Sequence, residues 1–179
     1  YGRSDRFYVK QFEEETNLRA QILVDVSESM GWTSSPGVLP AKLWYAKLLA
    51  AALALVLLRQ GDSVGMAAFH DRVVERVLAR GGRRQWSEIV RRLRPLEARG
   101  GTSAESALKD VAVRLRRRGL VILLSDLLVT PETTRTALRF LRHRGHEVLV
   151  FHLVDPGERE LPAASEATFF DPETQEELL

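Results

Sequence analysis

The sequence predicts an open, doubly wound α/β domain with a mostly parallel sheet, an antiparallel edge hairpin and helices on both faces. The first observation is the stretch "LVILLSDL" at residues 120–127, whose apolar run is typical of a strand buried on both faces of a parallel sheet. The second is the alternation of such strands with helical segments of 11 to 19 residues, which are long enough to form crossover connections. The third is the turn at His70 and Asp71, which indicates a hairpin.

The first half of the chain is expected to form a strand, a long helix and this hairpin. The polar residues 1–17 are interpreted as an N-terminal arm that leads into the domain, residues 18–179. Pro40 suits the first turn of the helix. Apolar residues recur in that helix at spacings of three and four and cover nearly all of its sides, so we expect it to be buried. The predicted elements are strands at 18–24, 63–69 and 72–78 and the helix at 41–59.

The second half alternates helices and strands. Pro95, Gly119 and Gly145 mark the ends of three helices. The C-terminal stretch "ATFFDPETQEELL" is expected to form a strand and an Asp-Pro turn, and to pair at the edge of the sheet. The other predicted elements are helices at 83–93, 104–118 and 131–143 and strands at 120–127 and 146–155.

Composition limits the chemistry that the chain can carry. At 179 residues it is long enough for one domain with a single core. It contains no cysteine, which excludes disulfides, thiolate metal sites and cysteine nucleophiles and fits a reducing compartment, so we expect a cytoplasmic location. The longest apolar run, Leu48 to Leu58, is shorter than the roughly 20 residues that cross a bilayer. The chain begins at Tyr1, however, and a membrane anchor could lie outside it.

Charge is distributed unevenly along the chain. The net charge is +2, but Asp155 to Leu179 holds eight acidic residues and one base, Arg159. The remainder therefore has 25 basic and 16 acidic residues, a balance that could attract nucleic acid or an acidic partner. No aromatic residues are interleaved with the arginines to stack on bases, so we interpret these arginines as solvated helix faces and do not expect nucleic acid to bind.

Small oxygen-bearing side chains follow several of the predicted strands. Asp25, Ser27 and Ser29 come directly after the first strand, Thr102 lies in a glycine-rich loop, and Asp126 ends the strand at "LVILLSD". In an open α/β sheet, ligands bind outside the carboxyl ends of the strands. Two carboxylates and three hydroxyls form an all-oxygen set, which suits a hard cation such as Mg²⁺. The sequence therefore predicts a metal site at this edge.

These residues resemble the metal-ion-dependent adhesion site of von Willebrand factor A domains. The matching parts are Asp25-x-Ser27-x-Ser29, Gly101-Thr102 and Ser125-Asp126, in the expected order, and the resemblance spans nearly the whole chain. It implies a doubly wound, Rossmann-like fold. It also implies that the two serines and the threonine ligate Mg²⁺ or Mn²⁺ directly, that the aspartates often act through water, and that a glutamate or aspartate of a partner completes the coordination.

Three longer stretches are similar to the bacterial proteins catalogued as domain of unknown function fifty-eight. They are "SDRFYVKQFEEETNLR", "YAKLLAAALALVLLRQGDSVG" and "DPETQEEL". Members of that family are often encoded beside an AAA+ ATPase of the MoxR type. The resemblance therefore implies a partnership with such an ATPase or its client in protein assembly or maturation.

Two residues near the serines are candidate partner contacts. Glu28 stands where many adhesion sites have a small residue, and it could shield the ion, face solvent or supply an internal ligand. Trp32 is either an anchor of its loop or an exposed contact. A further departure is "SDL", which ends at Leu127 where an Asp-Gly ending is commoner.

We expect a non-enzymatic, metal-dependent protein-interaction module. One alternative is a scaffold with a vestigial metal site that binds through its arginine-rich helices. Another is a Mg²⁺-dependent hydrolase of phosphate esters, but hydrolases of the haloacid dehalogenase type need a second acid where this chain has Ser27. The chain also lacks the Gly-x-Ser-x-Gly elbow of serine hydrolases and a glycine-rich phosphate loop after the first strand.

Overall fold

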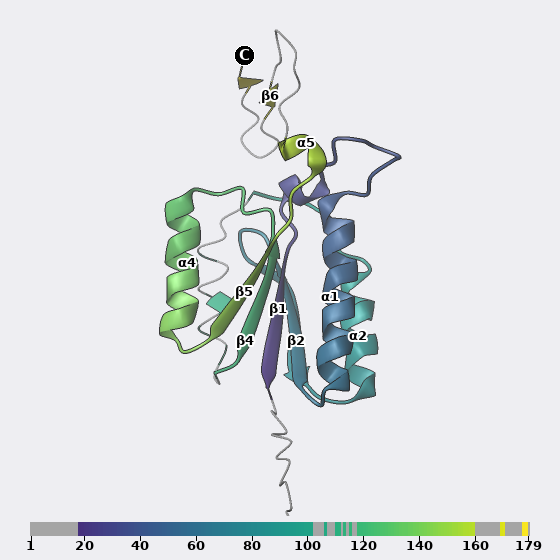
Figure 1. Cartoon of the computed structure of the whole chain (residues 1–179), viewed down its shortest axis with the longest axis vertical. Coiled ribbons are helices and arrows are strands. Elements are labelled where there is room, and N and C mark those ends of the chain that lie inside the picture. Colours follow the sequence, from purple (N-terminus) through teal and green to yellow (C-terminus); the bar gives the residue numbers. More distant parts are fainter. Residues whose placement is uncertain are drawn as a thin grey trace, which may run out of the picture.

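A five-stranded sheet with helices on both faces forms the centre of the structure (Figure 1). This computed structural model describes residues 18–101, 118–159, 169–170 and 177–178, together with Ser106, Asp110, Val111, Val113 and Leu115. The strand order is β3-β2-β1-β4-β5. The strands are β1 (Arg19–Asp25), β2 (Ser63–Phe69), β3 (Val73–Arg80), β4 (Leu120–Ser125) and β5 (Glu147–His152).

The pairing of the strands confirms the predicted fold class. β1 pairs in parallel with both β2 and β4, and β4 pairs in parallel with β5. β3 is the antiparallel edge strand and forms the hairpin with β2. Val24 of β1 lies opposite Leu124 of β4, so the residues that follow them leave the sheet at the same edge.

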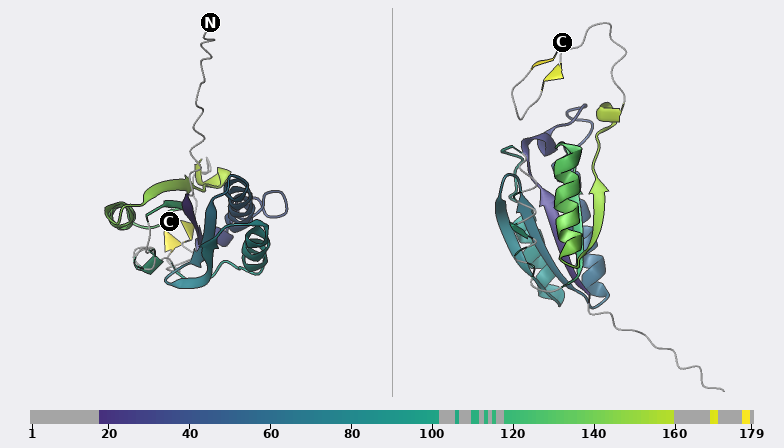
Figure 2. Two further views of the ribbon diagram at one scale, coloured as in Figure 1. Left: turned by 90° about the horizontal axis from the view of Figure 1, so that it is seen from below. Right: turned by 90° about the vertical axis from the view of Figure 1, so that its left-hand side faces the viewer.

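The helices form an outer layer on each face of the sheet (Figures 1 and 2). α1 (Lys42–Arg59) and α2 (Arg83–Leu93) cover one face, and α4 (Pro131–His143) covers the other. A short 3₁₀ helix, η1 (Glu28–Gly31), and α5 (Pro156–Arg159) lie at the end of the sheet where the parallel strands finish. That end carries the predicted site.

Alternation along β1 gives the sheet two hydrophobic cores. Successive side chains of a strand point to opposite faces, so both faces of β1 must be apolar when both are covered. Ala20, Ile22 and Val24 pack on the α1 face, whereas Leu23 packs on the α4 face. Ala46, Ala50 and Ala54 form a row of small side chains that turns α1 toward the sheet.

The expectation that the helix at 41–59 is buried is wrong for one of its faces. Trp44 and Tyr45 are 54% and 53% exposed, and Leu48 and Val56 are exposed to a similar degree. The reason is that α1 lies in the outer layer and turns only one side, which contains Leu43 and the alanine row, to the sheet. An apolar pattern on all sides of a helix does not by itself show that every side is covered.

The tail departs from its prediction, and one predicted helix is described only in part. β6 (Phe169–Phe170) pairs with β7 (Glu177–Leu178) in a separate two-stranded sheet and not with the edge of the main sheet. In the segment predicted as a helix at 104–118, Ser106, Asp110, Val111 and Val113 are helical, and most other residues lie outside the described part. None of the helices in the described ranges is long and apolar enough to span a membrane.

Candidate metal centre

Asp25 is the last residue of β1, and its carboxylate is fully buried. Its Oδ1 atom accepts a hydrogen bond from the backbone N–H of Ser27 at 2.9 Å. Its Oδ2 atom accepts one from the hydroxyl of Ser125, at the end of β4, at 2.6 Å. These two bonds fix the carboxylate between the loop after β1 and the end of β4.

Burial raises the pKa of Asp25 above its ordinary value. The hydrogen bonds from Ser125 and Ser27 act in the opposite direction, and the nearby charge of Asp126 raises the pKa further. Because this pKa is raised in the folded state, ionisation of Asp25 opposes folding. The protonated Asp25 therefore favours the folded state, and this stabilisation is lost as the pH rises through the folded-state pKa. A cation bound beside Asp25 would offset this cost.

Ser27 and Ser29 turn their hydroxyls toward each other. Both side chains are buried, and the two Oγ atoms lie 3.1 Å apart. The chain makes this possible because η1 begins at Glu28, and Met30 and Trp32 donate backbone hydrogen bonds to Ser27 and Ser29. The hydroxyls of the predicted ligand pair are therefore neighbours in a fixed turn.

Asp126 follows β4 and is also buried. His152 of β5 contacts its backbone oxygen through Nε2 at 2.9 Å. The next residue, Leu127, has a φ angle of 54°, in the left-handed region that costs a non-glycine residue roughly 1–2 kcal/mol. The commoner Asp-Gly ending would avoid this cost, and here the turn is held by a hydrogen bond of 3.0 Å from the Leu127 N–H to the Ser125 hydroxyl.

The loop that leads to Thr102 runs against the first loop. The N–H of Arg99 donates to the carbonyl of Val26 at 2.9 Å, and the N–H of Glu28 donates to the carbonyl of Gly100 at 3.0 Å. Thr102 itself lies outside the described residues. Of the five predicted ligands, Asp25, Ser27, Ser29 and Asp126 lie in two loops that the Ser125 hydroxyl joins.

The two candidate partner contacts differ in their surroundings. Glu28 is exposed, so its side chain is available to solvent or a partner. Trp32 is 42% exposed, and its ring centroid lies 5.8 Å from the Nζ atom of Lys42. Trp32 therefore both packs beside a cation and presents part of its ring at the surface.

Lys42 is a residue of this site that the sequence analysis missed. It is the first residue of α1, it is buried, and its Nζ atom lies 2.8 Å from Oδ2 of Asp126. This Oδ2 atom accepts no hydrogen bond, so the contact is an ion pair without good hydrogen-bond alignment. Lys42 also pairs with Glu158 of α5. A lysine at a helix N-terminus is unfavourable because the helix dipole repels its charge. Its position in the sequence therefore indicates that an anionic group lies nearby.

The α5 segment, which we define as residues 155–159, was also missed. The carboxylate of Asp155 accepts a hydrogen bond from the N–H of Gly157 at 2.8 Å, and Glu158 accepts one from the N–H of Asp155 at 2.8 Å. This reciprocal pair is a capping box, and "DPGE" with proline at the first helical position is its sequence signal. Asp155 also accepts hydrogen bonds from Thr33 and Ser34, which attaches the loop before α1.

The donor set fits a hard divalent cation. In the described part of the chain, no three histidine, aspartate or glutamate side chains are grouped to hold a metal. The predicted metal site differs from such a group, because hydroxyls supply two of its four described donor side chains. Two ligands at right angles around Mg²⁺ lie about 3 Å apart, and the Ser27 and Ser29 hydroxyls have this separation. Asp25 and Asp126 supply negative charge beside them.

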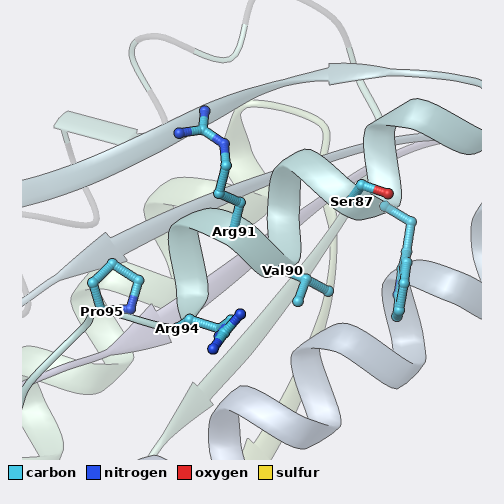
Figure 3. Close-up of a pocket in the computed structure, with 6 residues that line it drawn as sticks. Ser87, Val90, Arg91, Arg94 and Pro95 are labelled. Carbon is cyan, nitrogen blue, oxygen red and sulfur yellow. The ribbon is translucent and has the colours of Figure 1, made fainter.

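Two hollows border the helices of the α1 face. One, of about 540 Å³, runs between α1 and β5 and is lined in part by Lys42, Tyr45, Phe151 and Asp155. The other, of about 660 Å³, lies on α2 and is shown in Figure 3. Its lining residues are Trp86, Ser87, Val90, Arg91, Arg94 and Pro95.

Solved structures with a similar fold are known. A protein described as conserved hypothetical protein BatB from Bacteroides thetaiotaomicron is 21% identical with a TM-score of 0.55, over 74% of this chain and 65% of that chain. A protein described as an aerotolerance-related membrane protein from Bacteroides fragilis is 18% identical with a TM-score of 0.59, over 90% of this chain and 80% of that chain. At these identities the similarity shows the fold alone.

Sequence similarity extends over nearly the whole chain. Uncharacterized protein Rv1480 of Mycobacterium tuberculosis is 28% identical over 176 residues, which is 97% of this chain and 54% of that protein. An uncharacterized protein of Mycobacterium bovis matches equally well, so the chain spans about half the length of these curated relatives. The family described as "Protein of unknown function DUF58" matches residues 2–179. The chain therefore belongs to the DUF58 family.

Proposed function

We propose that this domain is a non-enzymatic, metal-dependent protein-interaction module. Asp25, Ser27, Ser29, Thr102 and Asp126 would hold Mg²⁺ or Mn²⁺, and the ion would offer an open coordination position to an acidic residue of a partner. The observation that carries the proposal is the pair of buried serine hydroxyls, 3.1 Å apart beside a buried aspartate. Hydroxyls are weak ligands without charge, so an ion held by them keeps a preference for an anionic ligand.

The partner that we propose is a MoxR-type AAA+ ATPase or its client, in protein assembly or maturation. The basis is the resemblance to a family whose members are often encoded beside such ATPases. Glu28 and Trp32 are exposed at the edge of the proposed ion site and would contact the same partner. A protein contact at this edge would be centred on the ion and on part of the Trp32 ring.

We also propose that the domain works in the cytoplasm. The absence of cysteine suits a reducing compartment. One structural relative is described as a membrane protein, and an anchor in another part of the full-length protein is compatible with a cytoplasmic domain.

Water relaxation on bound Mn²⁺ tests both halves of the proposal. Mn²⁺ bound by the wild type should enhance the relaxation of water protons, because an open position holds exchangeable water. A short peptide with a central glutamate, added at millimolar concentration, should lower the enhancement by displacing that water. The matched peptide with glutamine should leave it unchanged.

Two variants control this experiment. Ser27→Ala removes one proposed ligand and should abolish the enhancement, whereas Ser87→Ala on the exposed side of α2 should retain it. Equal enhancement in wild type and Ser27→Ala would place the metal elsewhere. Equal displacement by the glutamate and glutamine peptides would remove the acidic partner from the proposal.

The hollow on α2 favours a second candidate, a scaffold that binds through its arginines. Arg91 and Arg94 border the hollow beside Val90, so an acidic and partly apolar segment would suit it (Figure 3). Arg91 is already paired with Glu88, which reduces its value for a partner. Partner binding that survives a chelator and fails in Arg94→Ala would favour this candidate over the metal-bridged one.

A further inference from the structure

Lys42 places a positive charge beside a proposed metal ligand. Its Nζ atom is 2.8 Å from Oδ2 of Asp126, and both side chains are at least 95% buried. A buried ammonium requires negative partners, since removing a charge from water is costly. Lys42 has two of them in different elements, Asp126 after β4 and Glu158 in α5.

Helix stability does not explain this lysine. It stands at the first position of α1, where the helix dipole repels a cation, and Ala41 before it provides no side-chain cap. The charge at this position is balanced only by the two carboxylates of its ion pairs among the described residues. The placement is therefore explained by the site at the end of the sheet.

The ammonium and a divalent cation would compete for one carboxylate. Asp126 would be bound or oriented by the metal, and like charges a few ångströms apart in a buried site repel each other strongly. Lys42 already contacts Glu158, so it keeps one carboxylate partner when it loses Asp126, and the groove between α1 and β5, which Lys42 lines, leaves room for its side chain to shift.

Glu158 connects this competition to the rest of the chain. Its other oxygen accepts the Asp155 N–H, and Asp155 holds Ser34 in the loop before α1. Pairing of Lys42 with Glu158 alone would therefore act on the α5 segment, which follows β5 along the chain. The α5 segment, the loop before α1 and the start of α1 lie at the same end of the sheet (Figure 1).

We propose that Lys42 is a built-in cation that competes with the metal for Asp126, and that metal binding releases Lys42 from Asp126 and leaves it paired with Glu158 alone. The proposal rests on the metal site described above. It makes Glu158 a positioning residue for the metal, which acts only through Lys42. It also couples occupation of the site to the α5 segment.

A double-mutant cycle measured by calorimetric titration with Mg²⁺ tests this role. Lys42→Met should tighten Mg²⁺ binding by about tenfold, within the usual range of coupling between two sites. Glu158→Gln should weaken it several-fold, because Lys42 then has only Asp126. In the Lys42→Met background, Glu158→Gln should have no effect. Lys47→Met is the matched control, since Lys47 is on the same helix and donates to the backbone oxygen of Arg94.

The outcomes separate the two proposals. If neither the wild type nor Lys42→Met binds Mg²⁺, both proposals fail. If the wild type binds it and Glu158→Gln weakens binding equally in both backgrounds, the metal site stands and the role of Lys42 is wrong. Binding by Lys42→Met alone would support the competition in its strongest form.

Hydrogen exchange of the wild type covers the case in which Lys42→Met does not fold. Saturation with Mg²⁺ should increase the protection of the Asp155 and Glu158 amides, because Lys42 then pairs with Glu158 alone. The amides of α2, on the far side of α1, should not change. Unchanged or reduced protection in the α5 segment, with Mg²⁺ bound, would overturn the release of Lys42 from Asp126.

Discussion

Ser125 joins the two strands that carry the site. Its hydroxyl donates to Asp25 at 2.6 Å and accepts the N–H of Leu127 at 3.0 Å, and the side chain is buried. One residue therefore fixes the carboxylate of Asp25, which belongs to the proposed metal site, and holds the left-handed turn after Asp126. Neither function requires that Ser125 touch the ion.

Ser125→Ala should destabilise the protein, although the smaller alanine side chain introduces no steric clash. The change removes one hydrogen bond to a buried carboxylate and one from a backbone N–H, and leaving such groups unsatisfied costs about 1–3 kcal/mol each. Urea unfolding in the presence of a chelator measures the loss. Ser87→Ala, at an exposed position of α2, should change stability by less than about 0.5 kcal/mol. Equal losses in the two variants would contradict the role of Ser125.

Candidate metal ligands could be predicted from the sequence where they directly follow a predicted strand. Asp25, Ser27, Ser29 and Asp126 were predictable because parallel strands end at the same edge, and the described loops have that arrangement. Lys42 and Glu158 were not predicted, because their contact joins residues 116 positions apart through tertiary structure. The exposure of Glu28 likewise depends on η1, which begins at that residue.

At the level of elements, the α5 segment shows how five residues attach the loop before α1 and the end of β5 to the site. Asp155 accepts hydrogen bonds from Gly157 in its own segment and from Thr33 and Ser34 in the loop before α1. Burial raises the pKa of Asp155, but the hydrogen bonds from Ser34, Gly157 and Thr33 outweigh it, so the pKa is lowered overall.

Asp155→Ala should destabilise the protein by about 0.5–2 kcal/mol at neutral pH, the usual cost of losing a helix cap. A carboxylate with a lowered pKa in the folded state stabilises the fold above its unfolded pKa, and loses that effect as the pH falls through its folded pKa. The stability difference between wild type and variant should therefore shrink from about pH 7 to about pH 3. A difference that is independent of pH in urea unfolding would contradict this assignment.

Most elements of the sheet and its helices were predictable from periodicity. β2, α2 and α4 have the predicted bounds, because turn and capping residues lie beside them. Gly61 and Asp62 precede β2, Pro95 follows α2, and Thr130 and Gly145 lie on either side of α4. The exposed face of α1 and the separate β6-β7 sheet were not predictable, since both depend on which element lies beside them.

For the whole molecule, the sheet brings distant loops to one end. The loops after β1 and β4 and the loop at Arg99 and Gly100 are joined by hydrogen bonds there, and α1 begins beside them. The central claim is that this end of the domain binds a divalent cation. Such binding must stabilise the folded state, because the unfolded chain has no assembled donor set.

Thermal unfolding at increasing free Mg²⁺ tests this claim most directly, in the wild type and in Asp25→Asn. At about one hundred times the dissociation constant, the wild type should gain about 2.7 kcal/mol. For a domain of this size the gain corresponds to a Tm increase of roughly 5–10 °C. Asp25→Asn, with its carboxylate removed, should show no increase. An unchanged Tm in the wild type, or an equal increase in both proteins, would contradict the metal site.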